Sequence, residues 1–199
     1  VGKMGKSGAL FDVAKLNDIA KTYFAGKDEK ETFDFLKEWA EEFGNEAQKK
    51  YFADEEYAKK ILCLLMGIGS KKRRKDFACA VQAVASMAYF FDETFAPCDE
   101  YRFDKETVKS VIRSFSETYD IADDCSAWFD KVKAVAEKNG FCADMKAYKA
   151  NPENYKGSVS DVAEILRIAV TGHANTPDLW TIMQILGKER VLKRLAAQA

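Results

Sequence analysis

Apolar residues recur at helical spacing along most of this 199-residue chain. Between residues 28 and 44 they stand at i, i+3, i+7 and i+10, on one face of an α-helix: Phe33, Leu36, Ala40 and Phe43. Gly44 then predicts the end of that helix. The stretch from Glu56 to Met66 also reads as a helix, so the first part of the chain is predicted to be helical.

A longer apolar pattern runs from Lys75 to about Phe91. It predicts one long, deeply packed helix, with apolar positions at Phe77, Val81, Val84, Met87, Ala88 and Phe91. Aromatic residues gather at its end: Tyr89, Phe90, Phe91 and Phe95. Aromatic side chains at helical spacing favour a place in the core, although RNA bases also stack on such groups.

Pro97 separates two periodic blocks of the chain, because proline interrupts a helix. The sequence therefore predicts two consecutive helical sub-bundles, residues 1–97 and residues 98–199. In the second block, Asp104 is the expected N-cap of one further helix, and residues 158–161 offer several N-cap choices for another. The predicted fold class is all-α.

The end of the chain reads as three helices separated by glycines. Gly172 closes the first helix, and Gly187 separates the second from a basic third one. Thr176 is the expected N-cap of the middle helix and Pro177 its first residue, because proline lacks a donor that would be unpaired there. Asp178 favours the positive helix start. Taken alone, this pattern indicates a well-capped helical hairpin.

Composition limits the kinds of site that the chain can build. Its five cysteines form no Cys-x-x-Cys pair and His173 is the only histidine, so we expect no metal site. No apolar run approaches the roughly 20 residues of a membrane span, and no signal peptide is recognised. Nucleophile elbows, P-loops and dinucleotide fingerprints are missing, so no catalytic residue is predicted.

Opposite charges nearly balance, with 31 Lys and Arg against 32 Asp and Glu. Their distribution is uneven: residues 28–56 are rich in Asp and Glu, whereas residues 71–75 are an unbroken basic run. A sparser basic set follows near the end of the chain: Lys188, Arg190, Lys193 and Arg194. Such runs are often solvated faces or loops, but five cations on one loop can also contact several phosphates.

Two segments at opposite ends of the chain resemble one protein family. The C-terminal segment reads Leu166-Arg167-Ile168-Ala169-Val170-Thr171-Gly172, then Thr176-Pro177-Asp178-Leu179, then Leu186-Gly187-Lys188-Glu189-Arg190-Val191-Leu192. This order resembles the anticodon-binding region of bacterial glutamyl-tRNA synthetases, a class I family. The stretch from Ser7 to Asn17 resembles the family's segment leaving the stem-contact domain, which makes residues 1–17 that exit. Residues 51–158 match only in helical pattern.

The resemblance implies a parent enzyme that attaches glutamate to tRNA(Glu) through an ATP-activated glutamyl-adenylate, with tRNA(Gln) as a second candidate partner. ATP and Mg would act in a catalytic domain that this chain lacks, so the chain itself is expected to be non-catalytic and without a cofactor. The lysine loop of class I synthetases is similar to the stretch Lys3-Met4-Gly5-Lys6-Ser7. In this family, however, that loop lies further upstream, before the stem-contact domain, so the similarity is taken as accidental. We expect a cytoplasmic monomer.

By resemblance, five residues line the pocket for the central and neighbouring anticodon bases: Arg167, Thr176, Pro177, Leu179 and Trp180. The Arg167 guanidinium offers a fork of donors to a base edge or a phosphate. Packing against the following helix is the alternative for Leu179 and Trp180. Candidates for contacts with RNA phosphates are Lys71, Lys72, Arg73, Arg74, Lys188 and Arg190.

One position departs from the family pattern. Many members carry an arginine that reads the third anticodon base, and its place here falls near Gly69 or Ser70. One of the cations at 71–74 is a candidate substitute, and a less strict reading of this base is the alternative. A rival function of another class also stays open, namely an all-helical protein-interaction module whose basic loop is merely solvated.

Overall fold

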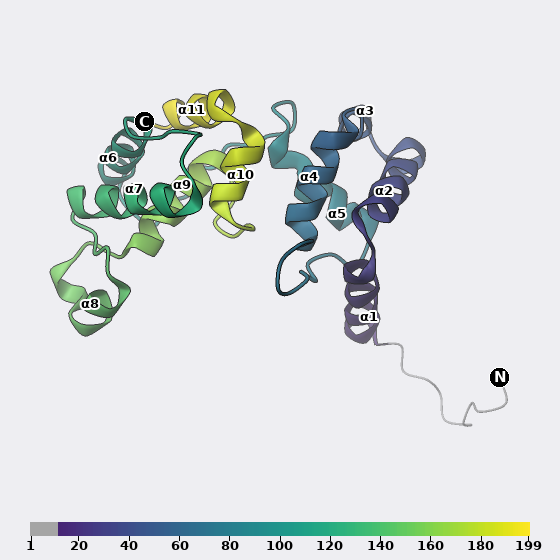
Figure 1. The fold of residues 1–199 in the computed structure, drawn as a ribbon, viewed down its shortest axis with the longest axis horizontal. Coiled ribbons are helices and arrows are strands. Elements are labelled where there is room, and N and C mark those ends of the chain that lie inside the picture. Colours follow the sequence, from purple (N-terminus) through teal and green to yellow (C-terminus); the bar gives the residue numbers. More distant parts are fainter. Residues whose placement is uncertain (1–11) are drawn as a thin grey trace. The chain divides into compact units, whose positions relative to one another are not determined.

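The computed structural model describes residues 12–199, and its regular elements in this range are helices (Figure 1). The prediction of an all-α fold is confirmed. The one β-type contact within residues 12–199 is an isolated bridge between Cys142 and Ser158. Within the same range, no helix has the length and apolar character needed to cross a bilayer. Residues 7–11 of the N-terminal resemblance lie outside the described residues, as does the Lys3–Ser7 stretch.

The chain divides into two compact units, residues 1–86 and 87–199. The first contains α1 (Val13–Gly26), α2 (Glu29–Phe43), α3 (Glu46–Lys50), α4 (Glu55–Met66) and most of α5 (Ala80–Met87). The first four helices begin at side chains that accept the backbone N–H three residues on: Asp12, Asp28, Asn45 and Asp54.

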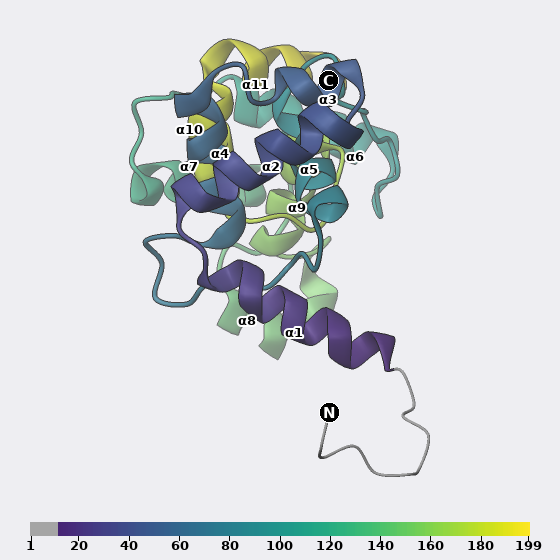
Figure 2. The same ribbon diagram turned by 90° about the vertical axis from the view of Figure 1, so that its right-hand side faces the viewer.

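Helices α2 and α4 lie side by side in this unit (Figures 1 and 2). The core here includes the fully buried Leu36, Ile61 and Leu62. The predicted helices over residues 28–44 and 56–66 are therefore confirmed. Phe43, expected on the buried face of α2, is instead 65% exposed at the end of the helix.

The long helix predicted from Lys75 to Phe91 is wrong. Only α5 is α-helical there, and it is followed by a single 3-10 turn, η1 (Ala88–Phe90). The backbone N–H of Arg74 donates to the Met66 carbonyl, which folds the preceding loop back onto the end of α4. The Lys75 side chain also donates to the hydroxyl of Thr22 in α1. Apolar spacing does not record such contacts, which accompany the non-helical path before Ala80.

The second unit contains η1, α6 (Lys105–Ser116), α7 (Cys125–Lys138), α8 (Met145–Ala150), η2 (Pro152–Asn154), α9 (Val159–Thr171), α10 (Leu179–Leu186) and α11 (Lys188–Ala196). Helix α9 contacts α6, α7, α10 and α11, so it lies at the centre of the unit. Its buried residues recur at helical spacing: Val162, Ile165, Leu166 and Ala169. The predicted N-cap Asp104 stands at the start of α6, and among the choices at residues 158–161 the N-cap of α9 is Ser158.

The division between the compact units falls between Ser86 and Met87, whereas the sequence predicts a boundary at Pro97. Residues after Met87 belong with the second unit because their backbone is bound by α11. The side chain of Arg190, for example, donates from Nη1 to the Phe90 carbonyl at 3.1 Å. A proline indicates where a helix ends, but it does not indicate with which unit the neighbouring residues pack. The assignment of two anticodon-binding subdomains stays a prediction.

Candidate nucleic-acid interface

Arg167 lies near the end of α9 and is bound by the loop that follows. Its Nη1 donates to the hydroxyl of Thr176 and to two carbonyls, those of Thr176 at 3.3 Å and Pro177 at 2.6 Å. Its Nη2 and Nε make no hydrogen bond with residues 12–199. Burial lowers the pKa of the guanidinium from its usual value, and the charge of Asp178 acts in the opposite direction. Part of the donor fork is thus left for a ligand.

The predicted start of α10 is wrong. Thr176 is not the N-cap and Pro177 is not the first helical residue, because the N-cap is Asp178. Its Oδ2 accepts from the backbone N–H of Thr181 at 2.8 Å and from the Thr181 hydroxyl at 2.7 Å. The Thr176 hydroxyl is instead an acceptor for Arg167. Thr176 and Pro177 therefore belong to the loop before α10 rather than to the helix.

The three apolar residues predicted to line the anticodon pocket are largely turned away from solvent. Leu179 is 1% exposed and Pro177 is buried. Trp180 is half-buried, and its Nε1 donates to the Asp123 carbonyl at 3.1 Å. Burial of Leu179 fits the packing alternative, and a contact of these side chains with RNA stays a prediction. The exposed residues of the loop are His173, Ala174 and Asn175.

Gly172 shapes the same loop in a way that only glycine allows. Its φ is +75°, and an added Cβ would lie 2.2 Å from the Ala96 carbonyl oxygen. The following residue, His173, places its ring edge-on against that of Tyr89, with 5.8 Å between the ring centres. The sequence does not predict the contacts of Ala96 with Gly172 and of Tyr89 with His173, because a contact between residues this far apart leaves no trace in local spacing.

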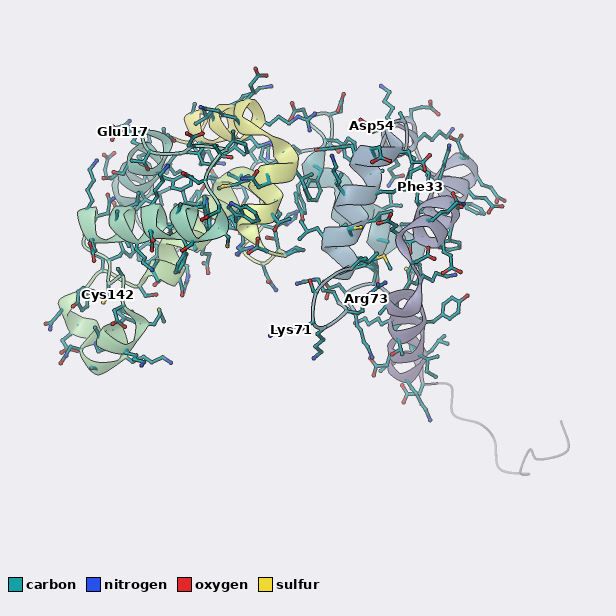
Figure 3. All side chains as sticks on the ribbon, viewed as in Figure 1. Phe33, Asp54, Lys71, Arg73, Glu117 and Cys142 are labelled. Carbon is teal, nitrogen blue, oxygen red and sulfur yellow. The ribbon has the colours of Figure 1, made fainter. Side chains whose placement is uncertain are left out.

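The basic run at residues 71–75 does not form a uniform solvent-facing patch. Three of its cations have partners within the first unit: Arg73 the carbonyl of Lys27, Arg74 the carboxylate of Asp76 at 2.7 Å, and Lys75 the hydroxyl of Thr22 at 3.1 Å. Lys71 and Lys72 are exposed and have no hydrogen-bond or ion-pair partner within residues 12–199. Figure 3 shows Lys71 on the outer side of the loop and Arg73 turned toward α1. Lys71 and Lys72 are therefore the strongest phosphate-contact candidates of the run.

The C-terminal cations also fall into two groups, those exposed to solvent and those that bind other parts of the protein. Lys188 is exposed at the start of α11, whereas Arg190 contacts the Phe90 carbonyl and Arg194 is buried. The carboxylate of Asp92 lies 3.1–4.0 Å from three of these cations: Arg190, Lys193 and Arg194. Much of the positive charge of α11 therefore holds the backbone near residues 89–92. Contact of Lys188 or Arg190 with RNA stays a prediction.

Within residues 12–199, no three His, Cys, Asp or Glu side chains are arranged to hold a metal ion. The Arg167 guanidinium is held at one of its nitrogens and lies next to an exposed loop, residues 173–175. Single-stranded RNA bases are read by such donors at their Watson–Crick edges.

Comparisons with known proteins show the family of the chain. Residues 36–199 match the family model described as an anticodon binding domain. Among curated relatives, the glutamate–tRNA ligase of Acetivibrio thermocellus is 42% identical over 98% of this chain, and that of Clostridium perfringens is 39% identical over 97%. The chain spans 36% of the length of each. The chain therefore belongs to the anticodon binding domain family.

Proposed function

We propose that this chain is the anticodon-recognising part of a glutamate–tRNA ligase and binds tRNA(Glu). The match of residues 36–199 to the anticodon binding domain carries the proposal, and similarity to glutamate–tRNA ligases over 98% of the chain supports the choice of tRNA. The full-length protein would attach glutamate to that tRNA in the cytoplasm. ATP and Mg would act in the part of the relatives' length that this chain does not span.

Recognition of the bases centres on Arg167 in this proposal. Its Nη1 is engaged by Thr176 and Pro177, which orders the side chain before RNA arrives. Because a pre-ordered side chain loses little freedom on binding, its remaining donors contribute more of their hydrogen-bond energy to affinity. Nη2 and Nε are the donors proposed for a base edge or a phosphate.

Lys71 and Lys72 supply the proposed contacts of the first unit. Both are exposed, and one of them takes the place of the third-base arginine missing near Gly69. A lysine is a point donor without the planar fork of arginine, so it reads a base less strictly. Weak discrimination at that base would make tRNA(Gln) a second partner.

Binding of the 199-residue chain to two RNA hairpins tests the proposal. One hairpin carries the anticodon loop of glutamate tRNA, and the other has the same stem with a scrambled loop. We expect tighter, one-to-one binding of the first hairpin at low salt, with both affinities falling as salt rises. Equal affinity for the two hairpins would contradict anticodon recognition and favour the protein-interaction module.

A further inference from the structure

Arg194 of α11 is a buried cation, 4% exposed, that binds two separate segments of the second unit. Its Nη1 donates to the carbonyls of Tyr89 at 2.7 Å and Val170 at 2.8 Å, and its Nη2 donates to Asp92 at 3.1 Å. The guanidinium carbon lies 3.9 Å from the centre of the Phe95 ring. A buried charge is costly unless partners compensate it, so these contacts fix the positions of both segments relative to α11.

The first segment is the end of α9. Val170 lies in its last turn, where carbonyls have no partner within the helix. Gly172 follows two residues later and opens the loop that leads to Thr176, which Arg167 binds. By binding the Val170 carbonyl, Arg194 fixes the end of the helix from which this loop extends.

The second segment, residues 89–96, supports the same loop through different contacts. The Ala96 carbonyl lies so close to Gly172 that no side chain fits there. The Tyr89 ring contacts the ring of His173, and Tyr89 also opposes the lowering of the pKa of Arg167. Both segments bound by Arg194 therefore meet at residues 172–177.

We propose that Arg194 is a positioning residue for RNA binding, which holds the loop of residues 172–177 in its binding conformation through the carbonyls of Val170 and Tyr89. This inference rests on the proposed function. Arg194 is buried and acts through the loop, unlike Lys188 and Arg190 of the same helix, which are candidates for direct contact.

The position of the loop has a natural reporter. His173 is the only histidine of the chain, so the NMR signals of its ring are free of overlap from other histidines, and the Tyr89 ring shifts them. We expect Arg194→Lys to move these signals, because lysine cannot reach both carbonyls and Asp92 with a fork. Tyr89→Leu removes the aromatic ring, so this variant shows in which direction the His173 signals move when the Tyr89 ring no longer acts on them. Arg113→Lys, the same change at an exposed position of α6, is the matched control.

Binding to the two hairpins provides the second readout. In the full 199-residue chain, Arg194→Lys is expected to weaken binding of the anticodon hairpin by about tenfold. Affinity for the scrambled hairpin, which depends on Lys71 and Lys72, should stay unchanged. A purely structural role would alter both affinities together, or neither. Circular dichroism at the assay temperature establishes that each variant is folded.

Asp92→Asn is the second variant, for the case in which Arg194→Lys does not fold. It weakens one contact of Arg194 at a partly exposed carboxylate and should produce the same two effects, but smaller. A folded Arg194→Lys chain would overturn the proposal if its His173 signals do not move, or if its two hairpin affinities stay at the wild-type values or fall together. Where Arg194→Lys is unfolded, any of these results for Asp92→Asn would do so. If the wild-type chain does not prefer the anticodon hairpin, the proposed function fails, and the His173 signals alone then decide whether Arg194 positions the loop.

Discussion

At the scale of single residues, Arg167 and Arg194 illustrate two uses of the same side chain. Arg167 is half-buried and commits one nitrogen to Thr176 and Pro177, whereas Arg194 is buried and binds two carbonyls and a carboxylate. The sequence places Arg194 in one basic set with Lys188, Arg190 and Lys193, of which only Lys188 and Arg190 are predicted to contact RNA. The position of Arg194 between the buried Val191 and Leu195 was the signal that it faces inward.

Gly172→Ala should lower the free energy of unfolding of the second unit. A left-handed backbone costs a residue with a Cβ roughly 1–2 kcal/mol, and here the Cβ would also collide with the Ala96 carbonyl. Gly140→Ala is the control, since its φ is +81° but its nearest neighbour is a flexible lysine side chain at 3.6 Å. Urea denaturation measures both variants. A loss no greater for Gly172→Ala than for Gly140→Ala would contradict the close packing at this loop.

At the scale of elements, local signals predicted helices well where apolar spacing and a capping residue agreed. Helices α2 and α9 are examples, because each has a good N-cap residue at its start, Asp28 and Ser158 respectively. The prediction failed where a distant contact decided the path, as at Arg74 before α5. It also failed at α10, where both Thr176 and Asp178 are good caps and the contact between Thr176 and Arg167 decides between them.

Substitutions at the start of α10 check this revised cap. Asp178→Ala should reduce the free energy of unfolding by about 1 kcal/mol, because the first backbone N–H groups of the helix lose their acceptor. Thr176→Val keeps the cap and should cost less. Thermal and urea unfolding of both variants provide the comparison, and an unchanged free energy of unfolding for Asp178→Ala would contradict its assignment as the cap.

The loop after α4 is expected to contribute charge and only weak discrimination between bases, because a lysine is a point donor. Replacing Lys71 and Lys72 together by Ala should reduce the salt dependence of RNA binding, with the log–log slope falling by about 1.4 for two phosphate contacts to single strands. Replacing Lys146 and Lys149, exposed on α8, makes the same change in net charge and is the control. Identical slopes for the two double variants would remove Lys71 and Lys72 from the interface.

At the scale of the whole molecule, the unit boundary can be tested by truncation. A fragment from Met87 to the end should fold, whereas a fragment from Cys98 should not, because it lacks the Tyr89 carbonyl and Asp92 that compensate the buried Arg194. Leaving a buried charge unpaired costs about 3–5 kcal/mol, a large part of a typical domain stability. Circular dichroism with thermal unfolding would compare them. Equal stability would favour the boundary at Pro97.

A double-mutant cycle between Arg167 and the central anticodon base tests the central claim most directly. Wild-type and Arg167→Ala chains are titrated with the glutamate anticodon hairpin and with a hairpin in which that base is replaced. Arg167→Ala also releases Thr176 and Pro177, and the cycle separates this effect on the loop from a base contact. We expect Arg167→Ala to weaken binding by about 1–3 kcal/mol, and the base replacement to cost little more in that variant. Two losses that simply add would contradict the assignment of Arg167 to the base.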